Sequence, residues 1–156
     1  MRHKSLSNLI FGVLMVTFLG FGGCGSPITF TFPAGVTCTQ PKISVTANAS
    51  AFGGGTTQGK LKVKVCVTCS GTAVAGASVN MDLSELAEVP LPQGITIPPS
   101  LAGVTMANGC FEYSLPLRNI LDETIFKGLK VPYVVQDAST PPKEITSGTA
   151  TVIVGQ

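Results

Sequence analysis

Tryptophan is absent from this chain of 156 residues, and its one histidine is His3. His3 lies in an N-terminal segment that we expect to be removed by cleavage, which would leave a chain without histidine. Histidine is the usual general base, proton shuttle and metal ligand, so its absence excludes most hydrolase active sites. A glycosidase needs only two carboxylates, but no tryptophan is present to stack on a sugar ring. We therefore expect a protein that is not an enzyme.

The only side chains that could serve as catalytic groups in an enzyme are carboxylates and hydroxyls. The carboxylates are Asp82, Glu85, Glu88, Glu112, Asp122, Glu123, Asp137 and Glu144. They form no cluster with the spacing of an active site, and nothing in the sequence indicates a cofactor.

Charged side chains are also scarce, at 12% of the sequence. Two of the ten basic residues, Arg2 and Lys4, lie in the N-terminal segment, so the chain from residue 24 onward carries eight basic and eight acidic residues. A neutral domain has no basic patch, so nucleic acid is not an expected partner. Low charge, frequent Val and Thr, and the 18 glycines and 11 prolines favour an all-β sandwich or barrel.

The N-terminus has the pattern of a secretory signal peptide. The basic start MRHK precedes the apolar run LIFGVLMVTFLGF (9–21), and Gly22 and Gly23 follow. The run is shorter than the roughly 20 apolar residues that a membrane-spanning helix needs, and small residues suit a cleavage point. We expect residues 1–23 to be removed on export.

Phe21-Gly22-Gly23-Cys24 resembles the processing site of bacterial lipoproteins, with Phe where Leu is typical. The resemblance implies that Cys24 becomes an acylated first residue, and more than one acyl chain gives stable membrane attachment. Gly25 in place of Asp implies the outer rather than the inner membrane. The alternative is an ordinary signal peptide cut elsewhere, which would leave Cys24 unmodified.

We expect residues 24–41 to be a tether with a short edge strand at 28–32, and residues 42–156 to fold as one domain. Alternating apolar and polar residues predict strands at 43–47, 60–69, 79–83, 95–97, 111–115, 131–137 and 149–154. The glycine-rich segment 50–59 predicts a loop.

Lys60 to Cys69 has the clearest strand pattern in the chain. Apolar residues at every second position, from Leu61 to Val67, alternate with lysines. This period of two predicts a half-buried strand whose lysines form a solvated row, the alternative being a ligand-binding row. After the small-residue turn SGTAVAGAS, the alternation in residues 79–83 predicts the second arm of a β-hairpin.

Residues 85–104 contain four prolines, so we expect a long loop with only a short strand at 95–97. Asn108-Gly109 predicts a turn before a strand whose aromatic residues face the core. Apolar residues three and four apart between Pro116 and Gly128 predict a short amphipathic helix over 117–127. The alternative for that segment is a loop.

Two stretches resemble the bacterial Ig-like domains of invasin- and intimin-type adhesins. KVKVCVTCSGTAVAGASVNMDL (62–83) contains a Val-Ala-Gly-Ala-x-Val return, and VTMANGCFEYSL (104–115) contains that family's Thr-x-Ala-Asn-Gly-x-Phe strand start. The terminal GTATVIV (148–154) adds to the similarity. The resemblance implies an Ig-like β-sandwich of about seven strands with an adhesive or spacer role. The helix predicted over 117–127 would then lie in one of the connections between strands.

Four cysteines follow Cys24, namely Cys38, Cys66, Cys69 and Cys110. In an exported chain an even number of cysteines predicts disulfides. In the Ig-like arrangement that the resemblance implies, all four gather at one end of the sandwich. Among the three possible pairings, residue parity favours Cys66 with Cys110 and Cys38 with Cys69, although a one-residue bulge would exchange the partners.

Cys66 and Cys69 also form a CxxC motif, which has two other interpretations. A redox pair needs the motif at a helix N-terminus, where the dipole lowers a thiol pKa. A four-cysteine zinc site needs two such motifs. Because this CxxC ends a predicted strand and has no second copy, we expect disulfides and no metal.

These observations predict a lipid-anchored protein of the cell envelope with an Ig-like domain that acts as a structural or interaction module. Its expected partners are the membrane, through Cys24, and an envelope or extracellular protein. The alternative is a small-ligand or carbohydrate-binding module of the same fold, with a site on the loops at 50–59 and 85–104.

Overall fold

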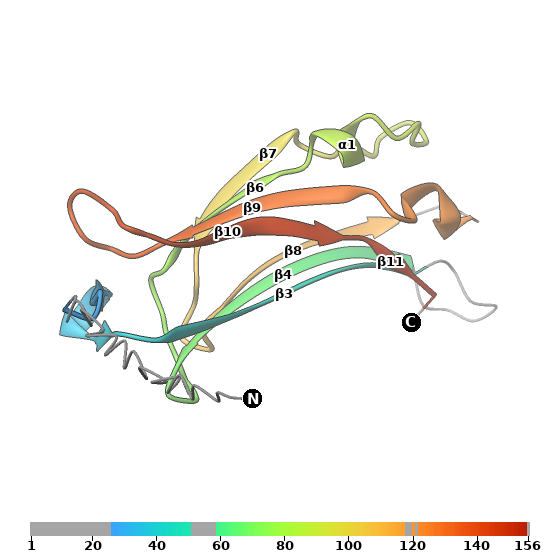
Figure 1. Ribbon diagram of the computed structural model, residues 1–156. Helices are drawn as coiled ribbons and strands as arrows, with labels where there is room; N and C mark the ends of the chain where they lie inside the picture. Colours follow the sequence, from blue (N-terminus) through green and yellow to red (C-terminus); the bar gives the residue numbers. More distant parts are fainter. Residues whose placement is uncertain (1–25, 51–58, 118–119, 121, 156) are drawn as a thin grey trace, which may run out of the picture.

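The computed structural model describes residues 26–50, 59–117, 120 and 122–155. These residues form an all-β fold with eleven strands, one four-residue α-helix and two short 3-10 helices. Seven strands have five or more residues, and they form two sheets that lie face to face (Figure 1). The prediction of an all-β domain is confirmed.

The first sheet is built around β4 (Gly59–Cys69). β3 (Pro41–Ser50) runs antiparallel to β4 on one side, and β8 (Cys110–Leu117) does so on the other. Two short strands complete the sheet, because β5 (Thr72–Ala73) pairs with the end of β4 and β11 (Ile153–Val154) runs parallel to β3.

The second sheet has the strand order β10-β9-β6-β7, and each neighbouring pair is antiparallel. Its strands are β6 (Ser78–Asp82), β7 (Ser100–Val104), β9 (Lys130–Gln136) and β10 (Glu144–Thr151). Pro141 and Pro142 lie in the turn between β9 and β10, as the sequence predicts.

The hydrophobic core lies between the two sheets. Every second residue of β4 from Leu61 to Val67 has an exposed fraction of 0%, whereas Lys60 is exposed. Val79, Val131 and Val135 of the facing sheet are buried to the same degree. The alternation of side chains thus turns one face of each sheet into the core, and the strand predicted over 60–69 is confirmed.

β8 is also confirmed, with Phe111 and Tyr113 packed against the core and Glu112 exposed. The Phe111 ring reaches the opposite sheet at Gly103, where an added Cβ would lie 2.2 Å from a ring carbon. Glycine at position 103 therefore makes room for the aromatic side chain between the sheets.

The hairpin predicted between residues 60–69 and 79–83 is wrong. β4 pairs with β5, and the chain then crosses to the second sheet, where β6 pairs with β7 and β9. In the crossing segment Val74 and Ala77, three residues apart, are both buried, at 3% and 0% exposed. This spacing breaks the two-residue alternation that a hairpin arm would need.

Residues 85–104 also differ from the prediction. Ser84–Ala87 form the helix α1, and the strand of this region is β7 rather than residues 95–97. Ile97 is 3% exposed but lies outside any strand. Its apolar character therefore reflects packing under a loop. Pairing starts only at Ser100, after Pro98 and Pro99, which have no N–H to donate.

The helix predicted over 117–127 is wrong where that segment is described. β8 continues to Leu117, which is fully buried, and the helical turn that follows is the 3-10 helix η2 (Glu123–Phe126). Residues 118, 119 and 121 lie outside the described residues. The apolar spacing arises because Ile120, outside any helix, and Phe126, at the end of η2, both pack into the core.

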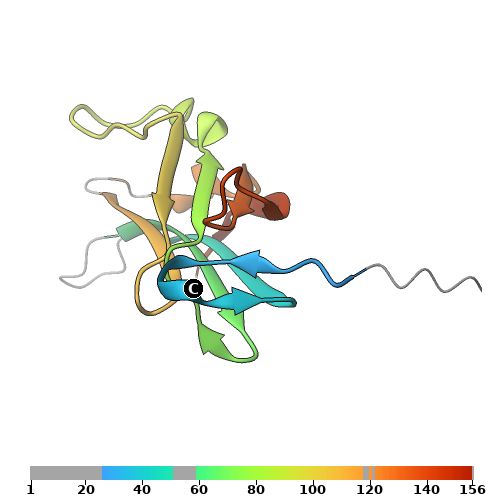
Figure 2. The ribbon, with the colours of Figure 1, turned by 90° about the vertical axis from the view of Figure 1, so that its left-hand side faces the viewer.

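A small N-terminal hairpin covers one end of the two sheets (Figure 2). β1 (Phe30–Thr31) pairs with β2 (Thr37–Cys38) in a sheet of their own, so the edge strand predicted at 28–32 is shorter than expected. Phe32 is 2% exposed, and an added Cβ at Gly76 would lie 2.3 Å from the Pro33 ring. Part of the expected tether therefore belongs to the folded body, because its aromatic residues are buried.

Candidate functional site

Both disulfides are present with the predicted pairing. Cys38 is bonded to Cys69 and Cys66 to Cys110, with S–S distances of 2.02 and 2.06 Å. Cys66 and Cys110 lie directly opposite each other in β4 and β8. We call the end of the sandwich that holds both disulfides the stapled pole; it comprises the β1–β2 hairpin and the turns at 70–71, 105–109 and 138–142 (Figure 1, left).

The bonded cysteines leave no thiolate for redox or metal chemistry in this state. The two sulfurs of the CxxC belong to different disulfides, which join β4 to β2 and to β8. Across the part of the chain that the structure describes, no group of three or more His, Cys, Asp or Glu side chains is placed to hold a metal ion.

The two motifs that resemble the adhesin family contact each other at the stapled pole. The Thr105 hydroxyl donates to the Val74 carbonyl (2.7 Å) and accepts from the Ala77 N–H (3.0 Å). The Thr105 backbone also donates to the Ala77 carbonyl (2.9 Å) and accepts from the Gly76 N–H (2.8 Å). Thr105 is 2% exposed, so these bonds satisfy buried polar groups and hold the segment that crosses between the sheets.

Asp137 joins the N-terminal hairpin to the turn between β9 and β10. Its carboxylate accepts from the N–H groups of Thr31 (3.0 Å), Lys143 (2.7 Å) and Ser139 (3.1 Å), and from the Ser139 hydroxyl (2.6 Å). Burial by itself would raise the pKa of Asp137, but these hydrogen bonds favour the charged form and hold the pKa at about 2. A carboxylate held in this way fastens two segments together and is a poor proton donor at neutral pH.

The other predicted carboxylates are spread over the fold. Three of them contact residues two or three positions away, which are Asp82 with Ser84, Asp122 with Thr124 and Glu144 with Ser147. Two contact other elements, which are Glu85 with the Lys130 N–H and Glu112 with Lys62. Hydrogen bonds from the Thr124 hydroxyl and N–H lower the pKa of Asp122, which caps η2. No two of the described carboxylates line the same one of the three hollows found among these residues.

The lysine row of β4 lies on the outer face of the first sheet, as predicted. Lys62 Nζ is 3.0 Å from Glu112 Oε2, and the two side chains are 40% and 38% exposed. An ion pair this accessible to solvent contributes less than about 1 kcal/mol to stability. The row is therefore a solvated face with one cross-strand ion pair.

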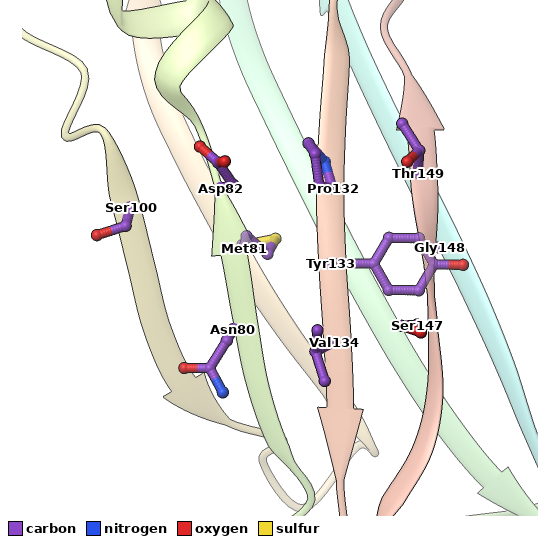
Figure 3. Close-up of a pocket in the computed structure, with 10 residues that line it drawn as sticks. All are labelled: Asn80, Met81, Asp82, Ser100, Pro132, Tyr133, Val134, Ser147, Gly148 and Thr149. Atoms are coloured by element: carbon purple, nitrogen blue, oxygen red, sulfur yellow. The ribbon is translucent and has the colours of Figure 1, made fainter.

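A groove of about 640 Å³ lies on the outer face of the second sheet (Figure 3). Side chains from all four strands line it, namely Asn80, Asp82, Ser100, Pro132, Val134, Ser147 and Thr149. These side chains are small, and Asp82 is the one charged group among them. The groove therefore offers a mainly neutral surface with hydrogen-bonding groups at its margins.

The groove lies where β6 and β9 stop pairing. Their ladder ends at Met81 and Tyr133, and the adjacent residue of β9 is Pro132, which has no N–H to donate. On its other side Pro132 still lies opposite Thr149 of β10. The proline thus ends one ladder and keeps the other, which leaves an opening between the central strands of the sheet.

Tyr133 crosses the neighbouring strand at a glycine. Tyr133 lies opposite Gly148 in β10, where an added Cβ would be 2.8 Å from the tyrosine oxygen. Figure 3 shows the ring lying over the strand at this point. Tyr133 shares the parity of the buried Val131 and Val135 and packs against the core. Gly148 therefore makes room for its ring on the inner face of β10, behind the groove.

The groove is not where the sequence predicts a site. The 85–104 loop contributes Ser100 to it, and otherwise borders a separate hollow of about 430 Å³ through Gly94, Ile95 and Thr96. Most of the 50–59 loop lies outside the described residues. The available sequence signal was Pro132 inside the apolar run VPYVV, since a proline in a central strand marks an interrupted ladder.

Residues 1–23 and Cys24 lie outside the described residues, so the signal peptide and the acylated cysteine stay predictions. Among the described residues, no helix has the length and apolar character to cross a membrane. Comparison with protein-family models, with curated proteins and with solved structures finds no match to this chain.

Proposed function

We propose that this protein is a lipid-anchored component of the bacterial cell envelope whose Ig-like domain acts as a structural or interaction module. The observation that carries the proposal is the pair of disulfides at one end of the sandwich. Disulfides persist in oxidising compartments outside the cytoplasm, which agrees with the signal-peptide pattern of residues 1–23.

The distribution of strands supports an Ig-like domain. The first, second and fifth of the seven long strands (β3, β4 and β8) share one sheet, and the other four form the second sheet. Ig-like sandwiches divide their strands in a similar way, with the chain changing sheets after the second strand. The contact between Thr105 and the 74–77 segment adds support, because it joins the two stretches that resemble the adhesin domains.

The anchor is the acylated Cys24, exposed as the first residue after removal of residues 1–23. Two or more acyl chains hold a protein stably on a bilayer without a spanning helix. Gly25 after this cysteine favours the outer membrane, by the resemblance to lipoproteins of two-membrane bacteria.

The outer face of the second sheet is the surface that we propose for interaction with an envelope or extracellular protein. Its groove is lined by strand residues, so its shape is set by the sheet and not by a mobile loop. The neutral lining makes desolvation on binding less costly than it would be on the lysine-bearing face of the first sheet.

A small neutral ligand such as a carbohydrate is the alternative occupant. The volume of about 640 Å³ falls within the range of ligand pockets. Asn80, Asp82 and Thr149 offer donors and acceptors for sugar hydroxyls. Glycan-array binding that is lost in Asn80→Ala but kept in Lys64→Ala, on the opposite outer face, would favour this alternative over a protein partner.

The test of the main proposal is mass spectrometry on protein from the native membrane fraction, alkylated without reduction. We expect acyl chains on Cys24 and no alkylation of Cys38, Cys66, Cys69 or Cys110. Recovery of the protein as a soluble cytoplasmic species, or alkylation of Cys66 and Cys69 in the folded protein, would overturn the proposal.

A further inference from the structure

We propose that the stapled pole rests on the lipid surface that holds the anchor, so that the sandwich stands upright on the membrane. In this orientation the groove of the second sheet faces sideways and residues 153–155 point away from the bilayer. The inference rests on the proposed acylation of Cys24 and adds to it an orientation and a lipid-contacting surface.

The length of the tether limits how far the domain can stand from the membrane. Phe30, which begins β1 and is 8% exposed, is six positions after Cys24, with five residues between them. At about 3.5 Å per extended residue, this segment spans at most about 20 Å. The eleven residues of β4 extend about 35 Å from one end of the sandwich to the other. The tether is thus too short for the opposite end to rest on the bilayer while the stapled pole points away from it.

Exposed apolar side chains concentrate at the same end. The large apolar residues exposed among those described are Ile28 (67%), Val36 (45%), Val104 (57%), Met106 (68%), Ile125 (37%) and Ile153 (57%). Ile28 precedes β1 and Val36 lies in the connection between β1 and β2, while Val104 and Met106 lie where β7 leads into the 105–109 turn. Four of the six therefore border the stapled pole, where they can enter the headgroup region of a bilayer.

The charges at the stapled pole suit an anionic lipid surface. Lys42 and Lys143 are exposed there, and the Lys143 ammonium donates to the Thr29 carbonyl (3.2 Å) in the tether. Asp137 is buried and bound by backbone donors, which leaves Glu144 as the exposed carboxylate next to this turn. Each lysine close to an anionic bilayer adds about 1 kcal/mol to the attraction.

A disulfide and two hydrogen bonds keep the β1–β2 hairpin fixed to the sandwich when force acts on the tether. The Cys38–Cys69 disulfide joins the end of β2 to the end of β4. Thr31 donates to Asp137 (3.0 Å) and accepts from the Ala138 N–H (2.8 Å). The hairpin therefore stays attached to the sandwich, and the tether holds the stapled pole close to the membrane.

The test compares lysines at the two ends of the sandwich by their rate of reaction with a neutral acylating reagent. The lipoprotein is placed in vesicles that contain anionic lipid, and the reference is the chain from residue 24 with Cys24→Ser, free in solution. A surface potential of about −30 mV raises the local proton concentration about threefold, which lowers the reactive free-amine fraction to the same extent. The effect fades within about 10 Å.

We expect Lys42 and Lys143 to react about threefold more slowly on vesicles than in solution. Lys60 at the start of β4 and Lys127 after η2 lie at the other end and should keep their rates. Val36→Ser with Met106→Ser should restore part of the reactivity of Lys42, because the apolar contact is lost. Ile153→Ser, which changes an equally accessible apolar side chain at the far end, should not.

The outcomes separate the orientation from the anchor. Acyl chains on Cys24 with equal rate changes at both ends, or with slowing at Lys60 and Lys127 instead, would overturn the orientation and leave the anchor intact. A chain without acyl chains would overturn both. Circular dichroism of each serine variant checks that it is folded, which is expected since all three positions are exposed.

Discussion

The two ends of the sandwich are held together in different ways. At the stapled pole, two disulfides, Asp137 and Thr105 join segments that are far apart in sequence; Thr31 and Asp137, for example, are 106 residues apart. At the opposite end the described side-chain contacts are hydrogen bonds: Asp122 accepts from the Thr124 N–H two residues away, and Glu85 accepts from the Lys130 N–H 45 residues away. The two disulfides persist in the unfolded chain and restrict it by linking residues 31 and 44 positions apart, whereas hydrogen bonds at either end break on unfolding. The stapled pole should therefore dominate stability, at the end where the proposed anchor attaches.

Removal of a disulfide should have the largest effect. The Cys66–Cys110 bond spans 44 residues, and its loss in Cys66→Ala with Cys110→Ala should lower the free energy of unfolding by about 4 kcal/mol. Guanidinium unfolding of the double variant and the parent measures the change. A loss below about 1 kcal/mol would contradict the claim that this end dominates stability.

Asp137→Asn should have the next largest effect. The amide keeps one acceptor oxygen but turns an NH₂ group toward buried N–H donors, which should cost about 2 to 3 kcal/mol. The same unfolding measurement on Asp122→Asn, a carboxylate that bonds locally at the opposite end, is the control. Equal losses in the two variants would remove the distinction between the ends.

The loss of stability at low pH should depend on the protonation of Asp137. Its pKa in the folded state is about 2, against an ordinary value of 3.8. Because the folded pKa is the lower one, its contribution to stability is complete above the ordinary value and is lost as pH falls toward 2. The unfolding free energy should therefore drop between about pH 5 and pH 2, and less steeply in Asp137→Asn. A parallel drop in both proteins would assign the effect to other carboxylates.

Thr105→Val tests the contact between the two family-like motifs. The substitution keeps the side-chain shape but leaves the Ala77 N–H and the Val74 carbonyl without their hydroxyl partner, which should cost about 2 kcal/mol. Thr149→Val on the exposed face of β10 should change stability by less than about 0.5 kcal/mol. Thermal unfolding of both variants measures the difference, and similar midpoints would show that the buried hydroxyl is dispensable.

The ion pair on the outer face of the first sheet should contribute least. Lys62→Ala should change the free energy of unfolding by a few tenths of a kcal/mol, since Glu112 stays solvated. A double-mutant cycle with Glu112→Ala isolates the pair at low and high salt. A coupling above about 1 kcal/mol would mean that this face is more than a solvated surface.

The strands with strict alternation were predictable, and the connections between them were not. Leu61 to Val67 define the buried face of β4 by their spacing, because side chains of a strand point to opposite sides in turn. The segment 74–77, which crosses between the sheets, is followed by an alternating strand, and a hairpin turn would be followed by the same pattern. The true path of this segment depends on burial of Val74 and on bonds from Thr105, thirty-one residues away. Local pattern holds no information about such distant partners.

The sequence by itself determined the all-β class and the lysine face of β4, which follow from the alternation of side chains within each segment. Cysteine parity favoured the disulfide pairing that the structure has, but a one-residue bulge would have exchanged the partners. Only the tertiary structure decided that Phe30 and Phe32 are buried, so that part of the expected tether forms the β1–β2 hairpin, and that Pro132 leaves a groove in the second sheet. It also decided that Asp137 binds the β1–β2 hairpin through the Thr31 N–H. All three features depend on which distant segments meet in the folded chain.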